Sequence, residues 1–220
     1  INLQLVGCKD DLGKTTKMPC PSYSISAHTC HTGKKLAEVP GSTCHDCYAL
    51  KGRYNYPSVV AAHERRLASI QTPEWAPAMK ALIDEKASAI GYFRWHDSGD
   101  LQSSEHLDKI AWIAQELPNI LFWLPTKEYT LVHRWLMNND KPVNLIIRPS
   151  APMIDGPAGY RPGLKFGHAY CAGVSGEPSF KDIAEATGVG ENTVKSRMRY
   201  ALVSLQKFLH GRGFTGPPEP

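Results

Sequence analysis

Residues 90–150 read IGYFRWHDSGDLQSSEHLDKIAWIAQELPNILFWLPTKEYTLVHRWLMNNDKPVNLIIRPS, and two patterns alternate within them. Apolar runs at 90–96, 119–125 and 143–150 have the length of buried strands. Residues 103–117 and 128–139 have the apolar spacing of amphipathic helices. Strands that alternate with helices in this way form βαβ units with parallel strands and right-handed crossovers. The sequence therefore predicts an α/β fold, in its simplest form a partial (β/α) barrel-like parallel sheet.

Polar side chains follow each of these predicted strands directly. Parallel α/β proteins bind their ligands at the carboxyl ends of the strands. We therefore expect a shared site for a small molecule or nucleotide substrate, with Arg94, His96, Asp97, Asp100, Lys127, Arg148 and Ser150 as candidate catalytic residues. For any single aspartate the alternative is structural, since aspartates are common in turns and at helix starts.

Two more helices and a short strand are expected upstream. Residues 57–70 begin with Pro57, a residue favoured in the first helical turn, and residues 73–86 carry apolar side chains at helical spacing. Residues 2–7 have the pattern of a short strand. The stretch GCKDDLGKT (7–15) is close to a phosphate-binding loop, but it has one residue too many between Gly7 and Gly13. Nucleotide binding is therefore not favoured at this loop.

The stretch from Cys20 to Cys47 is the richest in metal-binding side chains. It contains Cys20, Cys30, Cys44 and Cys47, with His28, His31 and His45 between them. Two residues separate Cys44 from Cys47, so that one tight turn can direct both sulfurs at one metal. We predict a cysteine-rich loop that holds a [4Fe–4S] cluster on the four thiolates. Zinc on the same thiolates, or with a histidine in place of one, is an alternative, and so are unliganded buried cysteines.

The composition is that of an ordinary globular protein, with 220 residues of which 42% are hydrophobic. The net charge of +4 permits nucleic-acid binding but does not argue for it. No apolar run approaches the roughly 18 residues of a membrane helix, and no secretory signal is visible, so no membrane contact is expected. Clustered thiols without a signal fit a reducing cytoplasm, where they bind metal more often than they form disulfides.

The carboxyl-terminal part has a different character. Residues 151–178 are rich in Pro and Gly, so we expect a metal-binding α/β domain over 1–165 and a linker over 166–178. Residues 179–210 fit a helix-turn-helix, in which Gly188 makes the turn and Val194 opens the second helix. Residues 211–220 are expected to be a disordered tail. The residues expected to contact DNA are Asn192, Thr193, Lys195, Ser196, Arg197 and Arg199.

The stretch DIAEATGVGENTVKSRMRYALVSLQKFL (182–209) resembles region four of the bacterial extracytoplasmic-function sigma factors. In that family the second helix reads a promoter element, and the resemblance therefore implies DNA as a partner. Nothing in the chain resembles the other core-binding region of a sigma factor, so a complete sigma factor is not expected. A helical hairpin used for packing or dimerisation is the alternative.

Five motifs give the main body a second resemblance. They are CPSYSISAHTCHTG (20–33), GSTCHDCYALKGRY (41–54), FRWHDSGDLQS (93–103), FWLPTKEY (122–129) and IIRPSAPMIDG (146–156). In this order they make residues 1 to about 165 similar to the gene product 88 family of actinobacteriophages. The resemblance implies a phage protein that acts in the cytoplasm of a bacterial host.

A weaker resemblance is to the radical S-adenosylmethionine enzymes, which are partial (β/α) barrels with three cluster-binding cysteines on an early loop. The corresponding triplet here is Cys30, Cys44 and Cys47, although the first gap of thirteen residues is longer than is usual in those enzymes. This resemblance implies an enzyme that uses a [4Fe–4S] cluster and S-adenosylmethionine. The alternative is a DNA-binding regulator whose metal domain is structural.

Overall fold

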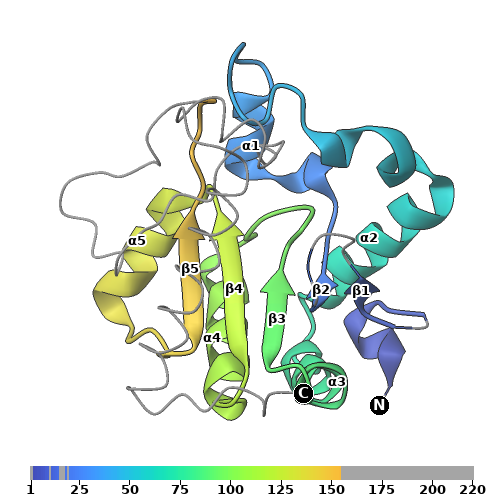
Figure 1. Cartoon of the computed structure of the whole chain (residues 1–220), viewed down its shortest axis with the longest axis vertical. Coiled ribbons are helices and arrows are strands. Elements are labelled where there is room, and N and C mark those ends of the chain that lie inside the picture. The colour runs from blue at the N-terminus through green and yellow to red at the C-terminus, as the bar shows by residue number, and fades with distance from the viewer. Residues whose placement is uncertain (1, 10, 15–17, 19, 155–220) are drawn as a thin grey trace, which may run out of the picture. The chain divides into compact units, whose positions relative to one another are not determined.

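The structure is a computed structural model that describes residues 2–9, 11–14, 18 and 20–154. Its sheet has the strand order β1-β2-β3-β4-β5, so that neighbours in sequence are neighbours in space (Figure 1). The strands are β1 (Gly13–Lys14), β2 (Pro21–Tyr23), β3 (Tyr92–Trp95), β4 (Leu121–Thr126) and β5 (Leu145–Pro149). β1 is antiparallel to β2, and the other pairs are parallel. The predicted α/β fold with a mainly parallel sheet is confirmed.

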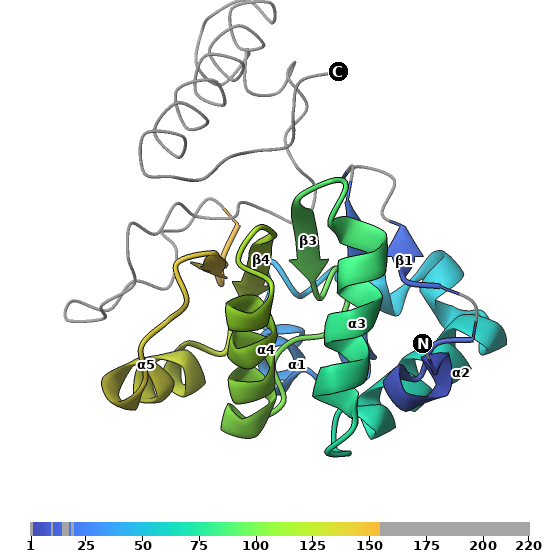
Figure 2. The same cartoon turned by 90° about the horizontal axis from the view of Figure 1, so that it is seen from below.

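The helices that cover the sheet lie on one of its faces. The α-helices are α1 (His31–Leu36), α2 (Pro57–Ser69), α3 (Trp75–Ala87), α4 (Ser104–Glu116) and α5 (Tyr129–Asn138). The 3₁₀ helices are η1 (Leu3–Val6), η2 (Ala27–Thr29), η3 (Tyr48–Leu50) and η4 (Gly52–Asn55). Figure 2 shows α3, α4 and α5 side by side on the same face. Right-handed crossovers between strands in sequential order produce this one-sided arrangement, and no described helix covers the other face of β3, β4 and β5.

The alternation of strand side chains decides which face the helices cover. In β4 every second residue, from Phe122 to Thr126, is buried. The covered face carries Phe93, Trp95, Phe122, Leu124, Leu145 and Ile147. The same core contains Met79, Leu82 and Ile83 of α3 and Leu107, Ile110 and Ala111 of α4. Removal of these apolar side chains from water is the main free-energy gain of folding.

A buried aromatic group joins β2 to the helices. The Tyr23 ring centre lies 5.9 Å from that of Trp75 and 6.3 Å from that of Trp95. The Tyr23 hydroxyl donates to the Val6 carbonyl oxygen at 2.8 Å and accepts from the Trp75 indole nitrogen at 3.2 Å. Because a buried hydroxyl is costly unless it is hydrogen-bonded, these contacts fix η1 and α3 against β2.

Several element boundaries follow local signals that are visible in the sequence. Pro57 stands in the first turn of α2, as predicted, and the Ser103 side chain accepts from the His106 amide and caps α4. Gly99 has a φ of 84°, and a Cβ there would lie 2.3 Å from Ile25 Cγ1. Only glycine therefore fits the turn after β3.

Two local predictions are wrong. Residues 2–7, predicted as a strand, contain the 3₁₀ helix η1, because the Asn2 side chain accepts from the Gln4 amide and Gly7 closes the turn with a φ of 67°. The cysteine segment, predicted as loop throughout, contains β2 and α1. β2 is only three residues long and gains its stability from pairing on both sides, which a local pattern does not reveal.

Residues 155–220 lie outside the described residues, and with them the predicted linker (166–178), helix-turn-helix (179–210) and tail (211–220). By its contacts the chain divides into Ile1–Ser175 and Gly176–Pro220, and every described residue belongs to the first unit. None of the helices within 2–154 that the structure describes combines the length and hydropathy needed to cross a bilayer.

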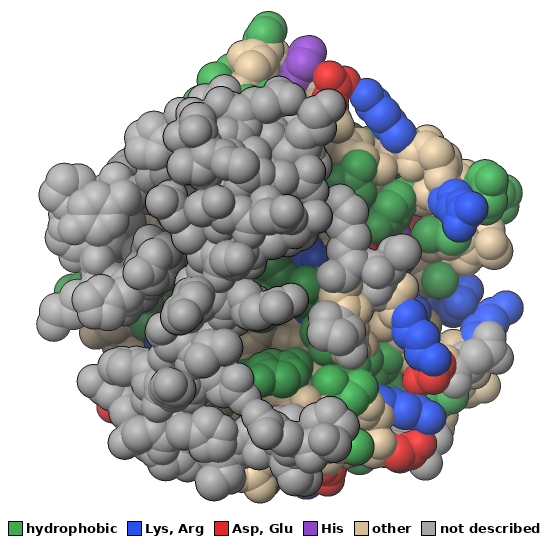
Figure 3. Space-filling view, in the orientation of Figure 1, with side chains coloured by type: hydrophobic (Ala, Val, Ile, Leu, Met, Phe, Trp, Pro, Cys, Tyr) green, Lys and Arg blue, Asp and Glu red, His purple; other side chains and the backbone are tan. Residues whose placement is uncertain are grey.

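The charges of the described residues are scattered over the face seen in Figure 1. Figure 3 shows Lys and Arg side chains spaced along the side formed by the amino-terminal elements, some of them next to Asp or Glu. Where the described residues are visible in Figure 3, the cations are thus interspersed with acidic and uncharged side chains.

Candidate functional site

The part of the cysteine segment that follows β2 lies at the carboxyl ends of the strands, where Figure 1 shows α1 above β3 and β4. Glu128, which follows β4, accepts hydrogen bonds from the Thr32 amide at 2.8 Å and from Thr32 Oγ1 at 3.0 Å. Hydrogen bonds to a carboxylate are about twice as strong as neutral ones. Glu128 thus fixes α1, and Cys30 just before it, to the end of β4.

Asp97 and Thr43 attach the second half of the segment. The Asp97 carboxylate accepts from the Tyr54 hydroxyl at 3.2 Å, and its backbone carbonyl accepts from the Tyr48 hydroxyl. Thr43 Oγ1 donates to the carbonyl oxygen of Ala151, after β5, at 2.9 Å. The turn that carries Cys44 and Cys47 is therefore held at the same sheet edge as Cys30.

Two of the predicted thiols lie together there, and a third acts on them through its charge. A Cβ at Gly33 would lie 3.0 Å from Cys30 Cβ, 3.7 Å from Cys30 Sγ and 3.6 Å from Cys44 Sγ. Both sulfurs therefore border the same glycine of α1, whose missing side chain leaves them room. Cys47 is close enough for its charge to act on both Cys30 and Cys44.

The surroundings of Cys30 and Cys44 disfavour the thiolate form of these two residues. Burial raises the pKa of Cys30, and the negative charges of Asp100 and Cys47 raise it further. Burial also raises the pKa of Cys44, against which the Lys127 ammonium acts. Within the described ranges, no three His, Cys, Asp or Glu side chains already form a metal site. The three sulfurs would have to turn toward one another to share a metal.

Cys20 is apart from the other three. It precedes β2, whereas Cys30 follows it, so Cys20 lies at the amino-terminal edge of the parallel strands. It borders a hollow of about 420 Å³ with Lys14 and Lys86, and Arg94 is the charged side chain that acts on its thiol. The structure therefore does not bring the predicted four-cysteine set together, because a three-residue strand separates Cys20 from the rest.

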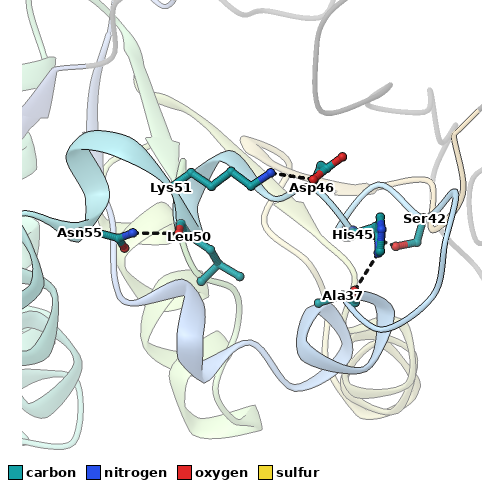
Figure 4. Close-up of polar contacts among 7 residues, drawn as sticks. All are labelled: Ala37, Ser42, His45, Asp46, Leu50, Lys51 and Asn55. Atoms are coloured by element: carbon teal, nitrogen blue, oxygen red, sulfur yellow. Dashed lines mark hydrogen bonds and ion pairs between the residues drawn. The ribbon is translucent and has the colours of Figure 1, made fainter.

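The histidines of the segment make individual contacts. His45 Nδ1 lies 3.0 Å from the Ala37 carbonyl oxygen, and Figure 4 shows the ring directed at that residue. His31 Nε2 lies 3.3 Å from the Gln102 carbonyl oxygen. His28 is exposed and borders, with Cys30 and His31, an open hollow of about 700 Å³. This hollow gives the Cys30 side of the thiol group access to solvent.

Asp100 joins the ends of two strands. Its carboxylate accepts from Thr126 Oγ1 at 2.5 Å, from the Lys127 amide at 2.8 Å and from the Leu101 amide at 2.8 Å. Burial raises the pKa of Asp100 to about 6, although these hydrogen bonds oppose the shift. Because its oxygens already accept these hydrogen bonds, the main role of Asp100 is to link the ends of β3 and β4.

His96 is buried directly after β3 with a φ of 53°. Neither ring nitrogen has a hydrogen-bond partner among the described residues, and the ring centre lies 5.2 Å from that of His106. Burial lowers the pKa of His96 to about 3, so the ring is neutral. A buried imidazole in a left-handed backbone is a strained arrangement of the kind that often occurs at functional sites.

The remaining predicted residues lie at different places on the sheet. Lys127 follows β4 near Cys44, whereas Ser150 continues the β4–β5 pairing through its amide, which donates to the Thr126 carbonyl oxygen at 2.9 Å. Arg94 and Arg148 lie within β3 and β5 on the face without described helices. Lys127 is thus the predicted cation whose charge acts on one of these thiols, Cys44.

The sequence reasoning missed the residues that position the thiols. Thr32, Gly33, Tyr48 and Glu128 were not predicted as part of the site. A signal exists for one of them, because a carboxylate directly after a predicted strand was the criterion applied to Asp97 and also fits Glu128. The partners of Tyr48 and Thr32 are long-range and have no local signal.

The expected DNA-contacting residues, Asn192, Thr193, Lys195, Ser196, Arg197 and Arg199, lie outside the described residues.

Comparison with known proteins extends the family resemblance. The family model described as Gene product 88 matches residues 4–205. The match continues past residue 165, where the motif resemblance was expected to end, and covers most of the predicted helix-turn-helix. No curated protein and no solved structure matches the chain.

Proposed function

The chain belongs to the Gene product 88 family, and we propose that it is a metalloprotein whose Cys30, Cys44 and Cys47 hold a [4Fe–4S] cluster at the carboxyl edge of the sheet. The observation that carries this proposal is that two separate segments bring their thiols to one glycine, Gly33. Bringing reduced thiols and carboxylates together does not by itself lower the free energy of the folded state. It becomes favourable when a cation offsets the charge of the thiolates.

Three ligands suit a cluster better than a structural zinc. Structural zinc sites in proteins usually close with four protein ligands. The segment's histidines are the candidates for a fourth zinc ligand, but His31 and His45 each contact a backbone carbonyl. Zinc on the three thiols with His28 or a rearranged histidine is the second candidate centre.

The one-sided sheet fits an enzyme of the partial (β/α) barrel type. A cluster on three thiolates would supply one-electron chemistry and an open iron position, for which S-adenosylmethionine is the ligand that the sequence resemblance suggests. The chain's own residues would have supporting roles. Lys127 would offset negative charge near Cys44, Glu128 would hold α1 in place, and the hollow beside Cys30 would admit the ligand.

Anaerobic purification followed by iron, sulfide and zinc analysis tests this proposal. We expect a brown protein with about four irons per chain. Serine at Cys30, Cys44 or Cys47 should each remove most of the iron. Cys20→Ser is the matched control, because the structure sets Cys20 apart, and it should keep the iron and the absorption spectrum.

Three results would speak against the cluster. Retention of full iron by Cys30→Ser, or its loss in Cys20→Ser, would contradict the three-thiol assignment. A colourless protein with one equivalent of zinc would select the second candidate centre, and a protein that takes up neither metal would remove the proposal.

A second role follows from the sigma-like pattern at 179–210 and is independent of the metal. We propose that this segment binds DNA through Arg197, Arg199 and their neighbours, in which case the metal domain would be part of a regulator. The support is the sequence pattern alone.

A further inference from the structure

The face of the sheet without described helices carries an arginine stacked on a tryptophan. Arg94 of β3 and Trp123 of β4 are register partners and lie on this face, which is turned toward the viewer in Figure 1. The guanidinium carbon of Arg94 lies 4.8 Å from the centre of the Trp123 ring. A guanidinium held over an indole ring loses conformational freedom but keeps its hydrogen-bond donors.

Those donors have no acceptor within the described part of the chain. Arg94 takes part in none of the ion pairs found there, and its Nε is buried without a hydrogen-bond partner. Arginine has five donors and no acceptor, and it cannot become neutral in a protein. A half-buried arginine of this kind therefore lacks both a counter-charge and hydrogen-bond acceptors, and a bound oxyanion would supply both.

Asp97, the carboxylate that follows β3, does not serve as that counter-ion. Asp97 lies on the β2 side of β3, where its carboxylate is 3.4 Å from Ser22 Oγ and accepts from the Tyr54 hydroxyl. Arg94 reaches the opposite way, toward Trp123 on β4, and no nitrogen of Arg94 comes within ion-pair distance of Asp97. The side chains of Arg94, in β3, and Asp97, just after it, thus have different neighbours.

Two side chains with large apolar surfaces flank the pair formed by Arg94 and Trp123. Tyr92 precedes Arg94 on the same face and is 42% exposed, and Ile146, the β5 neighbour of Trp123, is 41% exposed. A ligand bound to Arg94 would therefore rest its remaining surface on apolar and aromatic side chains.

We propose that Arg94 and Trp123 form a binding site for a small anionic ligand with a flat apolar body. The fork of the guanidinium would take two oxygens of a carboxylate or phosphate group, and Trp123 would hold the fork in orientation. The site would be the anion-binding part of the substrate pocket, if the chain is an enzyme, but it does not require the metal centre. Its test therefore has an outcome separate from that of the cluster.

Titration of the full chain with AMP, benzoate, inorganic phosphate and acetate tests the proposal, with the Arg94 Nε–H resonance as readout. Arg94→Lys, in which one resonance disappears, assigns that signal. We expect AMP or benzoate to shift it, and the comparison between them to show which oxyanion the site prefers. The small anions should bind more weakly, because they lack the flat body.

Two matched variants separate the site from general charge. Arg94→Gln and Arg134→Gln each remove one positive charge, but Arg134 is exposed on α5, outside the site. Arg94→Gln should weaken binding about tenfold or more, as expected for the loss of hydrogen bonds to a charged group, whereas Arg134→Gln should not. Trp123→Phe, which keeps a ring, should give a smaller loss and remains informative if Arg94→Gln fails to fold.

The proposal is overturned by either of two results. One is the absence of any shift of the Arg94 signal with all four probes up to about 10 mM, which would exclude even millimolar affinity. The other is equal weakening by Arg94→Gln and Arg134→Gln, which would show attraction by net charge alone.

Discussion

His96 combines two features that a folded chain normally avoids. Its backbone is left-handed with a φ of 53°, and both of its ring nitrogens are buried without hydrogen-bond partners in the part of the chain that the structure describes. The first feature costs free energy because a Cβ is crowded in that region. The second means that the imidazole is tolerated only while it is neutral.

A pH dependence of stability follows from His96. Its folded-state pKa of about 3 is below the ordinary value of 6.5, so the stabilising effect of the neutral ring is present above pH 6.5 and is lost as the pH falls. Between about pH 7 and about pH 5, His96 should cost the wild type about 2 kcal/mol of unfolding free energy. His96→Asn, which tolerates a left-handed backbone and does not titrate, should remove this part of the loss in urea unfolding.

His28→Asn is the control for that measurement, because His28 is exposed and should leave the slope unchanged. A His96→Asn protein that loses as much stability on acidification as the wild type would show that His96 is already accessible to protons.

At the residue level, the sequence indicated which side chains lie at the carboxyl edge of the sheet, but not always which contacts they make there. Asp97 and Asp100 were predicted from their place after a strand, and both do lie at the carboxyl edge of the sheet. Their oxygens, however, are taken by Tyr54, Thr126 and backbone amides. A local pattern indicates that a carboxylate is present, but the partners from other elements lie 26 to 43 positions away.

The attachment of α1 to β4 is the decisive contact between elements. α1 has six residues and no side-chain cap, so it has little stability of its own. Its position depends on the Glu128 carboxylate, which receives two hydrogen bonds from Thr32.

We therefore expect Glu128→Gln and Thr32→Val to lower the unfolding free energy by about 1–3 kcal/mol each, as for hydrogen bonds to a charged group. The two effects should not be fully additive, because Thr32→Val removes the Oγ1 hydrogen bond, one of the two that Glu128→Gln weakens. The Cys30 thiol should also react faster with a thiol reagent in both variants. Denaturant unfolding and thiol-reaction rates measure these effects.

Glu116→Gln, on the exposed side of α4, is the matched control and should change stability by less than about 0.5 kcal/mol. Additive losses in the double variant would mean that Glu128 and Thr32 act on different contacts.

At the level of elements, long patterns were predicted well and short ones were not. The helices α2 to α5 and the strands β3 to β5 follow from apolar periodicity, because each buries a wide face that leaves a clear pattern. β2 and α1 did not follow, because three and six residues leave no periodic pattern. Their positions come from tertiary contacts, and these also separate Cys20 from the other thiols.

For the whole molecule, DNA binding by residues 179–210 can be tested separately from the metal centre. Arg197→Ala and Arg199→Ala should each weaken retardation of a promoter-like DNA fragment and lower the dependence of log affinity on log salt by about 0.9 per lost phosphate contact. Arg134→Ala, on the outer side of α5, should do neither. Gel retardation at several salt concentrations measures both quantities.

Unchanged retardation by the Arg197 and Arg199 variants, or no retardation by the wild type, would leave the segment as a packing or dimerisation hairpin. The match of the family model over residues 4–205 means that the segment is to be studied together with the α/β unit, as one family member.

The buried aromatic group gives the protein an intrinsic optical signal. Trp75 and Trp95 are fully buried, with ring centres 5.9 Å apart and planes inclined by 40°. Rings fixed in such an asymmetric setting produce strong near-ultraviolet circular dichroism, which disappears when packing loosens even if the helices persist. A single spectrum would thus separate substitutions that alter the sheet edge from those that melt the interior, before any ligand is added.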